Sequence, residues 1–213
     1  MWAWTLNWNE IRADLVIGSC PLEVADIDRI HDQAGATALL SLQSDVCLGH
    51  FGIDYAVHRL HGENLGLEMR RAPMRDFDIP DQRRHLARAI RTLHELLSQR
   101  HRVYLHCTAG LGRSALTALG YLSCVEAYRI EEALELLKTR RPGIVPSLEA
   151  YQGCRADLVD HYRPEIERRA GQAYRERLST HAEGSAASDW YAAERDVVRE
   201  LLTAPPTRCG ESV

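Results

Sequence analysis

Residues 102–114 have the sequence Arg-Val-Tyr-Leu-His-Cys-Thr-Ala-Gly-Leu-Gly-Arg-Ser, and this stretch decides the fold. Residues 103–105 predict a short buried strand, and the apolar periodicity from residue 112 to about residue 128 predicts a long helix. Residues 107–113 are therefore expected to form a strand-to-helix loop. Such a loop points its backbone N–H groups, and the positive end of the helix dipole, at whatever lies above it.

Cys107 lies at the predicted N-terminus of this helix and shares the loop with Arg113. This environment lowers the pKa of a thiol from about 8.5 into the range of roughly 3.5 to 7.5. Gly110 and Gly112 allow backbone conformations that residues with a Cβ avoid. We therefore predict a reactive thiolate inside an anion-binding loop. The alternative is a buried cysteine in a tight turn.

The pattern His106-Cys107-x5-Arg113-Ser114 resembles the signature of the cysteine-dependent protein tyrosine and dual-specificity phosphatases. The resemblance implies that Cys107 attacks phosphorus, that Arg113 holds the phosphoryl group, and that neither a metal nor a cofactor is needed. It also implies that Ser114 makes the thiol a better leaving group, while His106 orients the loop. The expected phosphate-binding residues are Thr108, Ala109, Gly110, Leu111, Gly112 and Arg113.

A general acid is expected in the loop Arg75-Asp76-Phe77-Asp78, which offers two carboxylates. The residues alone do not separate them. In the phosphatases that the chain resembles, the acid lies about thirty residues before the cysteine, and the loop also looks like that of the plant starch-excess phosphatases. The resemblance therefore favours Asp76 as the acid, with Asp78 as the runner-up. A solvated loop carboxylate is the alternative for either.

The loop Cys-Thr-Ala-Gly-Leu-Gly-Arg is similar to that of the glucan phosphatases, the laforin and starch-excess group. Residues 7–20, 42–43 and 51–54 resemble the plant enzymes too. This implies hydrolysis of phosphorylated starch or glycogen through a cysteinyl-phosphate intermediate. The alternatives are a dual-specificity phosphatase that acts on phosphotyrosine, phosphoserine and phosphothreonine in proteins, and a catalytically silent phospho-ligand or glucan-binding module. The expected substrate-binding residues are His50, Phe51, Phe77 and Asp78.

The composition excludes several other classes of protein. A formal net charge of -4 argues against nucleic-acid binding, which needs a basic surface. No basic segment followed by an apolar run begins the sequence, and no window is apolar enough to span a membrane, so a cytoplasmic location without membrane contact is expected. Six cysteines without CxxC pairs suggest neither a disulfide scaffold nor a zinc site. The partners expected are a phosphorylated glucan or a phosphoprotein.

The remaining pattern predicts an α/β domain over residues 1–162, with a central, mostly parallel sheet flanked by helices. Strands are expected at 14–18, 36–42 and 67–74, a long loop at 43–64, and helices at 22–34, 81–99, 130–140 and 146–162. Two amphipathic helices over residues 163–204 are expected to pack on the domain as a helical C-terminal extension, with dimerisation as the alternative. Residues 205–213 are expected to be a mobile tail. The chain is predicted to be a monomer or a homodimer.

Overall fold

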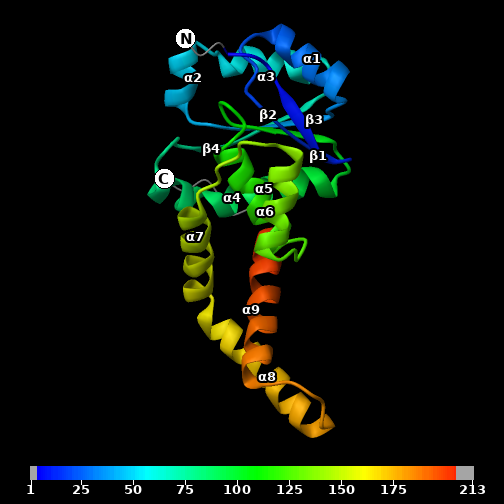
Figure 1. The fold of residues 1–213 in the computed structure, drawn as a ribbon, viewed down its shortest axis with the longest axis vertical. Coiled ribbons are helices and arrows are strands. Elements are labelled where there is room, and N and C mark those ends of the chain that lie inside the picture. The colour runs from blue at the N-terminus through cyan, green and yellow to red at the C-terminus, as the bar shows by residue number, and fades with distance from the viewer. Residues whose placement is uncertain (1–3, 205–213) are drawn as a thin grey trace.

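A five-stranded sheet forms the centre of the computed structural model, which describes residues 4–204 (Figure 1). Its order is β1-β2-β5-β3-β4, and only β1 runs antiparallel to its neighbour. The predicted mostly parallel sheet is therefore confirmed. The strands are β1 (Trp8–Arg12), β2 (Leu15–Gly18), β3 (Ala38–Gln43), β4 (Glu68–Met74) and β5 (Val103–His106).

The predicted strand of the deciding stretch, β5, is the central strand. Leu105 pairs with Ile17 of β2 on one side and with Leu40 of β3 on the other, and all three side chains are fully buried. Strands β2 and β3 are parallel, as the sequence predicts, but β5 lies between them. Cys107 therefore follows directly from the most protected strand, at the carboxyl edge where open α/β sheets bind ligands.

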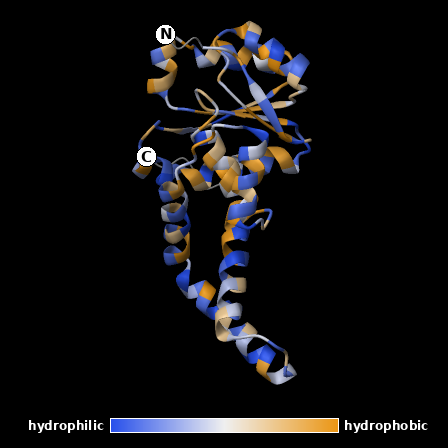
Figure 2. Cartoon of the chain, viewed as in Figure 1, coloured by the Kyte–Doolittle hydropathy of each residue, from blue (hydrophilic) through white to orange (hydrophobic). Residues whose placement is uncertain are grey.

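Helices cover both faces of the sheet, and Figure 2 shows apolar residues concentrated on the strands and on the helices that contact them. One face carries α1 (Val24–Ala34) and α3 (Tyr55–Asn64), with Ile27 and Ile30 packed on Tyr104. The other face carries a larger core. It is built by α4 (Ile79–Ser98), α5 (Arg113–Cys124), α6 (Ile130–Arg140) and α7 (Leu148–His161).

The expectation of a loop over residues 43–64 is wrong, because two capped helices form there. Helix α2 (Asp45–Phe51) begins after Ser44, whose hydroxyl accepts from the Cys47 N–H at 3.4 Å. Asp54 caps α3 by accepting from the Ala56 N–H at 2.9 Å. Side-chain caps of this kind satisfy the free N–H groups of a first helical turn, so both short helices form even though Gly52 lies between them.

Helix α4 begins two residues before the predicted start at residue 81. Asp78, rather than Asp81, accepts a hydrogen bond at the helix N-terminus, from the Asp81 N–H at 2.9 Å. The Asp81 carboxylate turns back and accepts from the Arg75 N–H at 2.7 Å. Pro80 fits this arrangement because the first helical turn does not need its N–H.

Two antiparallel helices, α8 (Arg163–Thr180) and α9 (Ala186–Thr203), form an arm that projects from the domain (Figure 1). Ile166 of α8 and Val197 of α9 are buried against each other's helix in a separate small core. Only the end of α9 reaches the main core, through Val198 and Leu202. Both helices were expected to pack on the domain, but this end of α9 packs on the main core, while α8 and the rest of α9 pack mainly on each other.

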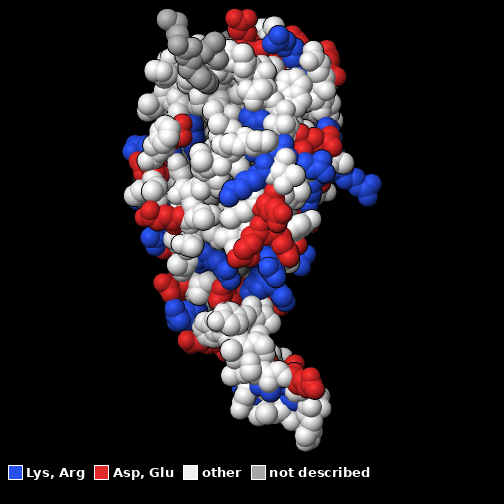
Figure 3. All heavy atoms as spheres, viewed as in Figure 1, with Lys and Arg blue, Asp and Glu red and all other residues white. Residues whose placement is uncertain are grey.

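Figure 3 shows a few acidic and basic residues close together near the tip of the arm, on a surface that is otherwise mostly uncharged in this view. The predicted mobile tail, residues 205–213, lies outside the described residues. No helix between residues 4 and 204 has the length and apolar character needed to cross a membrane.

Candidate active site

The loop of residues 107–112 joins β5 to α5 in the conformation that the sequence predicts, and we call it the nest. Gly110 has a φ of 73°, and a Cβ there would lie 2.3 Å from the Gly18 carbonyl oxygen. Only glycine fits this position. The nest therefore depends on close contact with the end of β2 as well as on the N-terminus of α5.

Cys107 lies at the bottom of the nest and is almost completely buried. Its Sγ lies 3.4 Å from the Ser114 hydroxyl, in the first turn of α5. Burial alone would raise the pKa of the Cys107 thiol. The charge of Arg113 and the hydrogen bond from Ser114 outweigh burial, so the pKa is lower than the ordinary value. The geometry therefore favours a thiolate.

Arg113 is fully buried, and its two terminal nitrogens have many partners. They donate to Leu42 O at 3.4 Å, Met74 O at 3.0 Å, Cys47 Sγ at 3.3 Å, Thr108 Oγ1 at 3.1 Å and Asp76 Oδ2 at 2.8 Å. The Nε has no hydrogen-bond partner among residues 4–204. A buried guanidinium N–H without an acceptor is costly, so this donor is suited to an oxygen of a bound anion.

The two candidate acids are separated by the turn between them. Asp76 lines the cavity above Cys107 and forms an ion pair with Arg113. Asp78 is instead the N-cap of α4 and is not among the residues that line this cavity. Phe77, between them, has a φ of 56°, a conformation in which the two neighbouring carboxylates point to different surroundings.

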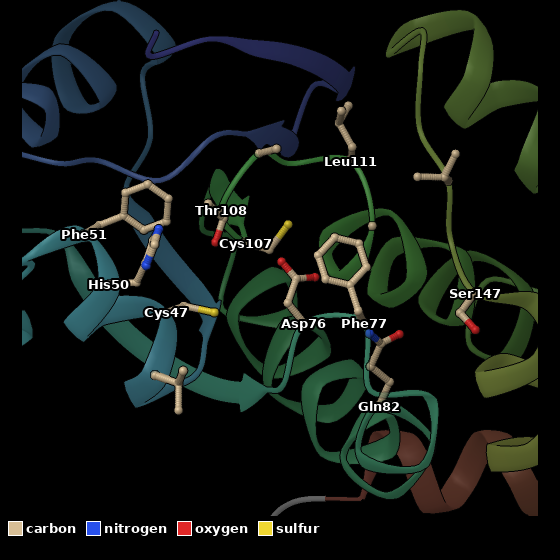
Figure 4. Close-up of a pocket in the computed structure, with 14 residues that line it drawn as sticks. Cys47, His50, Phe51, Asp76, Phe77, Gln82, Cys107, Thr108, Leu111 and Ser147 are labelled. Carbon is tan, nitrogen blue, oxygen red and sulfur yellow. The ribbon is translucent and has the colours of Figure 1, made fainter. Parts of the chain in front are cut away.

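The cavity above the nest has a volume of about 600 Å³. Figure 4 shows His50 and Phe51 on one side of Cys107 and Phe77 on the other. The Phe77 ring is 94% exposed, while the Phe51 ring packs edge-on against His50 with centroids 4.9 Å apart. Neither a lysine nor an arginine is among its lining residues within the described chain.

The family model of the dual specificity phosphatase catalytic domain matches residues 40–153, which are more than half of the chain. The chain belongs to the dual-specificity phosphatases. It therefore carries the catalytic domain of a cysteine-dependent phosphatase, as the loop pattern predicts.

Two curated relatives of this phosphatase differ in how much of the chain they match. Phosphoglucan phosphatase DSP4, amyloplastic, from Castanea sativa is 33% identical over 163 residues, covering 76% of this chain and 43% of that protein. Dual specificity protein phosphatase 4 from Homo sapiens is 34% identical over 116 residues, covering 54% of this chain and 26% of that protein. The chain thus spans less than half the length of either relative. The similarity to a glucan phosphatase, predicted from the loop, is confirmed.

The fold of the chain is also that of solved phosphatase structures. The structure of Tk-PTP in the active form superposes with a TM-score of 0.57 and 22% identity, covering 72% of this chain and 96% of that chain. This likeness concerns the fold alone.

Sequence reasoning missed Arg141, which binds the backbone of the nest on the side opposite the cavity. Its buried guanidinium donates to the Gly110 and Ala109 carbonyl oxygens at 2.8 and 3.0 Å. It also donates to the side-chain oxygens of Asn9 at 2.8 Å and Asn7 at 2.7 Å. By binding carbonyl groups on the outside of the loop, Arg141 orients the N–H groups inward. Nothing in the local sequence distinguishes it from the many exposed arginines.

Three further groups contact the nest or its arginine, namely the buried His106 and Gln43 and the half-buried Cys47. The His106 Nδ1–H donates to the Cys107 carbonyl oxygen at 2.9 Å, since a carbonyl oxygen can only accept, and burial lowers the pKa of His106 to about 4, so the ring is neutral. Gln43 donates to Thr108 Oγ1 at 3.4 Å. Burial opposes ionisation of the Cys47 thiol, but Ser44 and Arg113 outweigh it and lower the pKa. These contacts fix Thr108 and Arg113 from the side of β3 and α2.

Within residues 4–204, no three histidine, cysteine, aspartate or glutamate side chains are grouped so that they could hold a metal ion.

Proposed function

We propose that this phosphatase removes phosphate from phosphorylated glucan, such as starch or glycogen. The observation that carries the proposal is the cavity above the nest, which is lined by the exposed Phe77 and the half-buried Phe51 and, among residues 4–204, by neither a lysine nor an arginine. A glucan is a neutral polymer with isolated phosphates. It needs one anion site surrounded by apolar faces, because a sugar ring stacks its C–H face on an aromatic ring. Phe51 and Phe77 supply such faces on either side of Cys107 (Figure 4).

In the first chemical step the Cys107 thiolate attacks phosphorus. An S–P bond forms while the bond between phosphorus and the sugar oxygen breaks. The unpartnered Nε of Arg113 and the N–H groups of residues 108–113 receive the phosphoryl oxygens, whose charge is spread in the transition state. Because these donors are fixed by Arg141 and the start of α5, they need little rearrangement.

Asp76 supplies the proton that the leaving sugar oxygen requires. In the free protein the Asp76 carboxylate accepts a hydrogen bond from the Arg113 Nη2 at 2.8 Å. An entering phosphate therefore competes with this carboxylate for the guanidinium group. Once displaced from Arg113, Asp76 takes up a proton from the solvent and donates it to the leaving sugar oxygen. In the second step Asp76 accepts a proton from water, whose oxygen attacks phosphorus. The S–P electron pair returns to Cys107, where the Ser114 hydroxyl stabilises it.

The second candidate is a dual-specificity phosphatase acting on phosphoproteins, which the match to the human protein phosphatase favours. The human protein phosphatase matches this chain over 116 residues, whereas the Castanea sativa glucan phosphatase matches it over 163 residues at a similar identity. A catalytically silent binding module is the third candidate, and turnover of any phosphate ester that Cys107→Ser abolishes would exclude it. The cytoplasmic location and the monomeric or homodimeric state stay predictions.

A crystal structure of Cys107→Ser with a malto-oligosaccharide and inorganic phosphate tests the mode of binding. We expect phosphate in the nest and sugar rings in contact with Phe51 and Phe77. A cavity that excludes the sugar, but holds a phosphotyrosine peptide under the same conditions, would favour the protein substrate instead.

A further inference from the structure

A second large cavity lies far from the nest, between the turn joining α5 to α6, helix α7 and the arm helix α9. It has a volume of about 530 Å³, within the range of small-molecule sites. We call it the α9 groove and define it by six lining residues: Tyr128, Arg129, Tyr151, Arg155, Tyr191 and Arg195. Helix α5 starts at the nest and ends at the groove, so its 12 residues separate the two sites by about 18 Å.

The lining of the α9 groove is cationic. Three arginines line it, and no aspartate or glutamate does so among the described residues. Arg155 is held by Glu194 at 2.6 Å. Arg129 and Arg195 have looser partners.

The pairs made by Arg129 and Arg195 are long and open to solvent. Arg129 lies 3.5 Å from Glu132 and 3.9 Å from Glu131, and Arg195 lies 3.3 Å from Asp196. Both side chains in each of these pairs are more than half exposed. Exposed ion pairs of this kind contribute little, so both guanidinium groups can turn to a bound anion.

The groove also has aromatic and hydroxyl groups. Tyr191 is 67% exposed and Tyr128 is 38% exposed, so both rings offer a face to a ligand. Tyr151 accepts at its hydroxyl from Ser123 at 3.0 Å, and Ser188 adds another hydroxyl on the α9 side. Arginines fit phosphate oxygens, tyrosine faces fit the C–H face of a pyranose, and hydroxyl groups fit its OH groups.

We propose that the α9 groove is a second, non-catalytic site that binds a phosphorylated sugar. The phosphate is held by Arg129 and Arg195, and the sugar ring lies against Tyr128 or Tyr191. The ligand is either a free hexose phosphate or a phosphorylated residue of a polysaccharide, which share this chemistry. Cys124 also lines the groove, but it lies at the C-terminal end of α5, away from the helix N-terminus that activates Cys107. The proposal does not depend on which substrate the nest hydrolyses.

Nuclear magnetic resonance of the full chain carrying Cys107→Ser tests the proposal, because backbone amides report the two sites separately. The protein is titrated with glucose 6-phosphate, with a phosphorylated malto-oligosaccharide and with inorganic phosphate. We expect saturable shifts at residues 127–130 and 188–195, besides those at residues 108–113. Inorganic phosphate should bind the groove at least about tenfold more weakly, because it lacks a ring to stack.

The double variant Arg129→Ala/Arg195→Ala loses charge-assisted hydrogen bonds to the phosphate. Its groove should therefore bind the sugar phosphates at least about tenfold more weakly, while the affinity of the nest should not change. Arg175→Ala, an exposed arginine elsewhere on the arm, is the matched control and should change neither. Tyr191→Ala provides a second test if the double variant does not fold. With Cys107 restored, all these variants should keep the wild-type kcat/KM on a small aryl phosphate.

Shifts with glucose 6-phosphate would support a free hexose phosphate as the ligand, and shifts with the oligosaccharide alone would support a polymer-borne one. The proposal is overturned if the groove amides respond to neither sugar, if inorganic phosphate binds there as tightly, or if Arg175→Ala has the same effect as the double variant.

Discussion

Replacement of Phe77 by alanine probes the role of the exposed ring beside the nest. The ring is 94% exposed and packs against little of the protein, so the free energy of unfolding should change by less than about 0.5 kcal/mol. Full burial of a phenylalanine side chain is worth about 1.5–3 kcal/mol. A sugar ring covers one face, or about half of that area, which gives about 1 kcal/mol in the transition state. The kcat/KM on glucan should therefore fall about five- to tenfold.

The assay measures phosphate released from phosphorylated amylopectin, beside hydrolysis of a small aryl phosphate. Because an aryl phosphate reaches less of the cavity, its kcat/KM should fall less than about twofold. Leu60→Ala, which truncates a 60% exposed side chain on α3, is the matched control and should change neither rate. An equal loss on both substrates, or no loss on amylopectin, would refute the proposed contact with sugar.

Three other predictions concern the chemistry of the nest. Asp76→Asn should lower kcat about 10²- to 10⁴-fold on alkyl phosphates and less on aryl phosphates with good leaving groups; if Asp78→Asn shows this pattern instead, the acid is misassigned. Burial raises the pKa of Cys107, but Arg113 and Ser114 bring it below the ordinary value of a thiol, so iodoacetamide should alkylate Cys107 with a pH midpoint below that of free cysteine, and Ser114→Ala should move the midpoint upward; an unchanged midpoint argues against the hydrogen bond. Arg141→Lys should cost about 2–4 kcal/mol in urea unfolding, because buried carbonyl and amide oxygens lose their donors, and should also lower kcat; wild-type stability would contradict this role.

The central part of the fold follows from local sequence rules. The apolar residues of β5, the glycines of the nest and the apolar helix α5 each favour the same strand-loop-helix unit, so its prediction is correct. Helices α2 and α3 could not be predicted in this way. They are short and depend on the Ser44 and Asp54 caps, whose effect is visible only when the first-turn N–H groups are placed.

The site shows the same division between local and long-range information. Cys107, Arg113 and Ser114 are close in sequence, so their spacing predicts their arrangement. The distinction between Asp76 and Asp78 depends on the positive φ of Phe77. Mainly glycine and a few polar residues adopt a positive φ readily, so a phenylalanine at this position does not predict the turn. Arg141 reaches the nest from the end of α6, and its partners Asn7 and Asn9 lie more than 130 residues away in sequence.

The preference for glucan is the central claim, and it is tested most directly by comparing substrates of the wild-type protein. Phosphate release is measured from phosphorylated amylopectin, phosphorylated glycogen and a phosphotyrosine peptide, each divided by the rate on the same small aryl phosphate. We predict that at least one of the two glucans is dephosphorylated faster than the peptide on this scale. Release from both glucans that is no faster than release from the peptide would contradict the assignment.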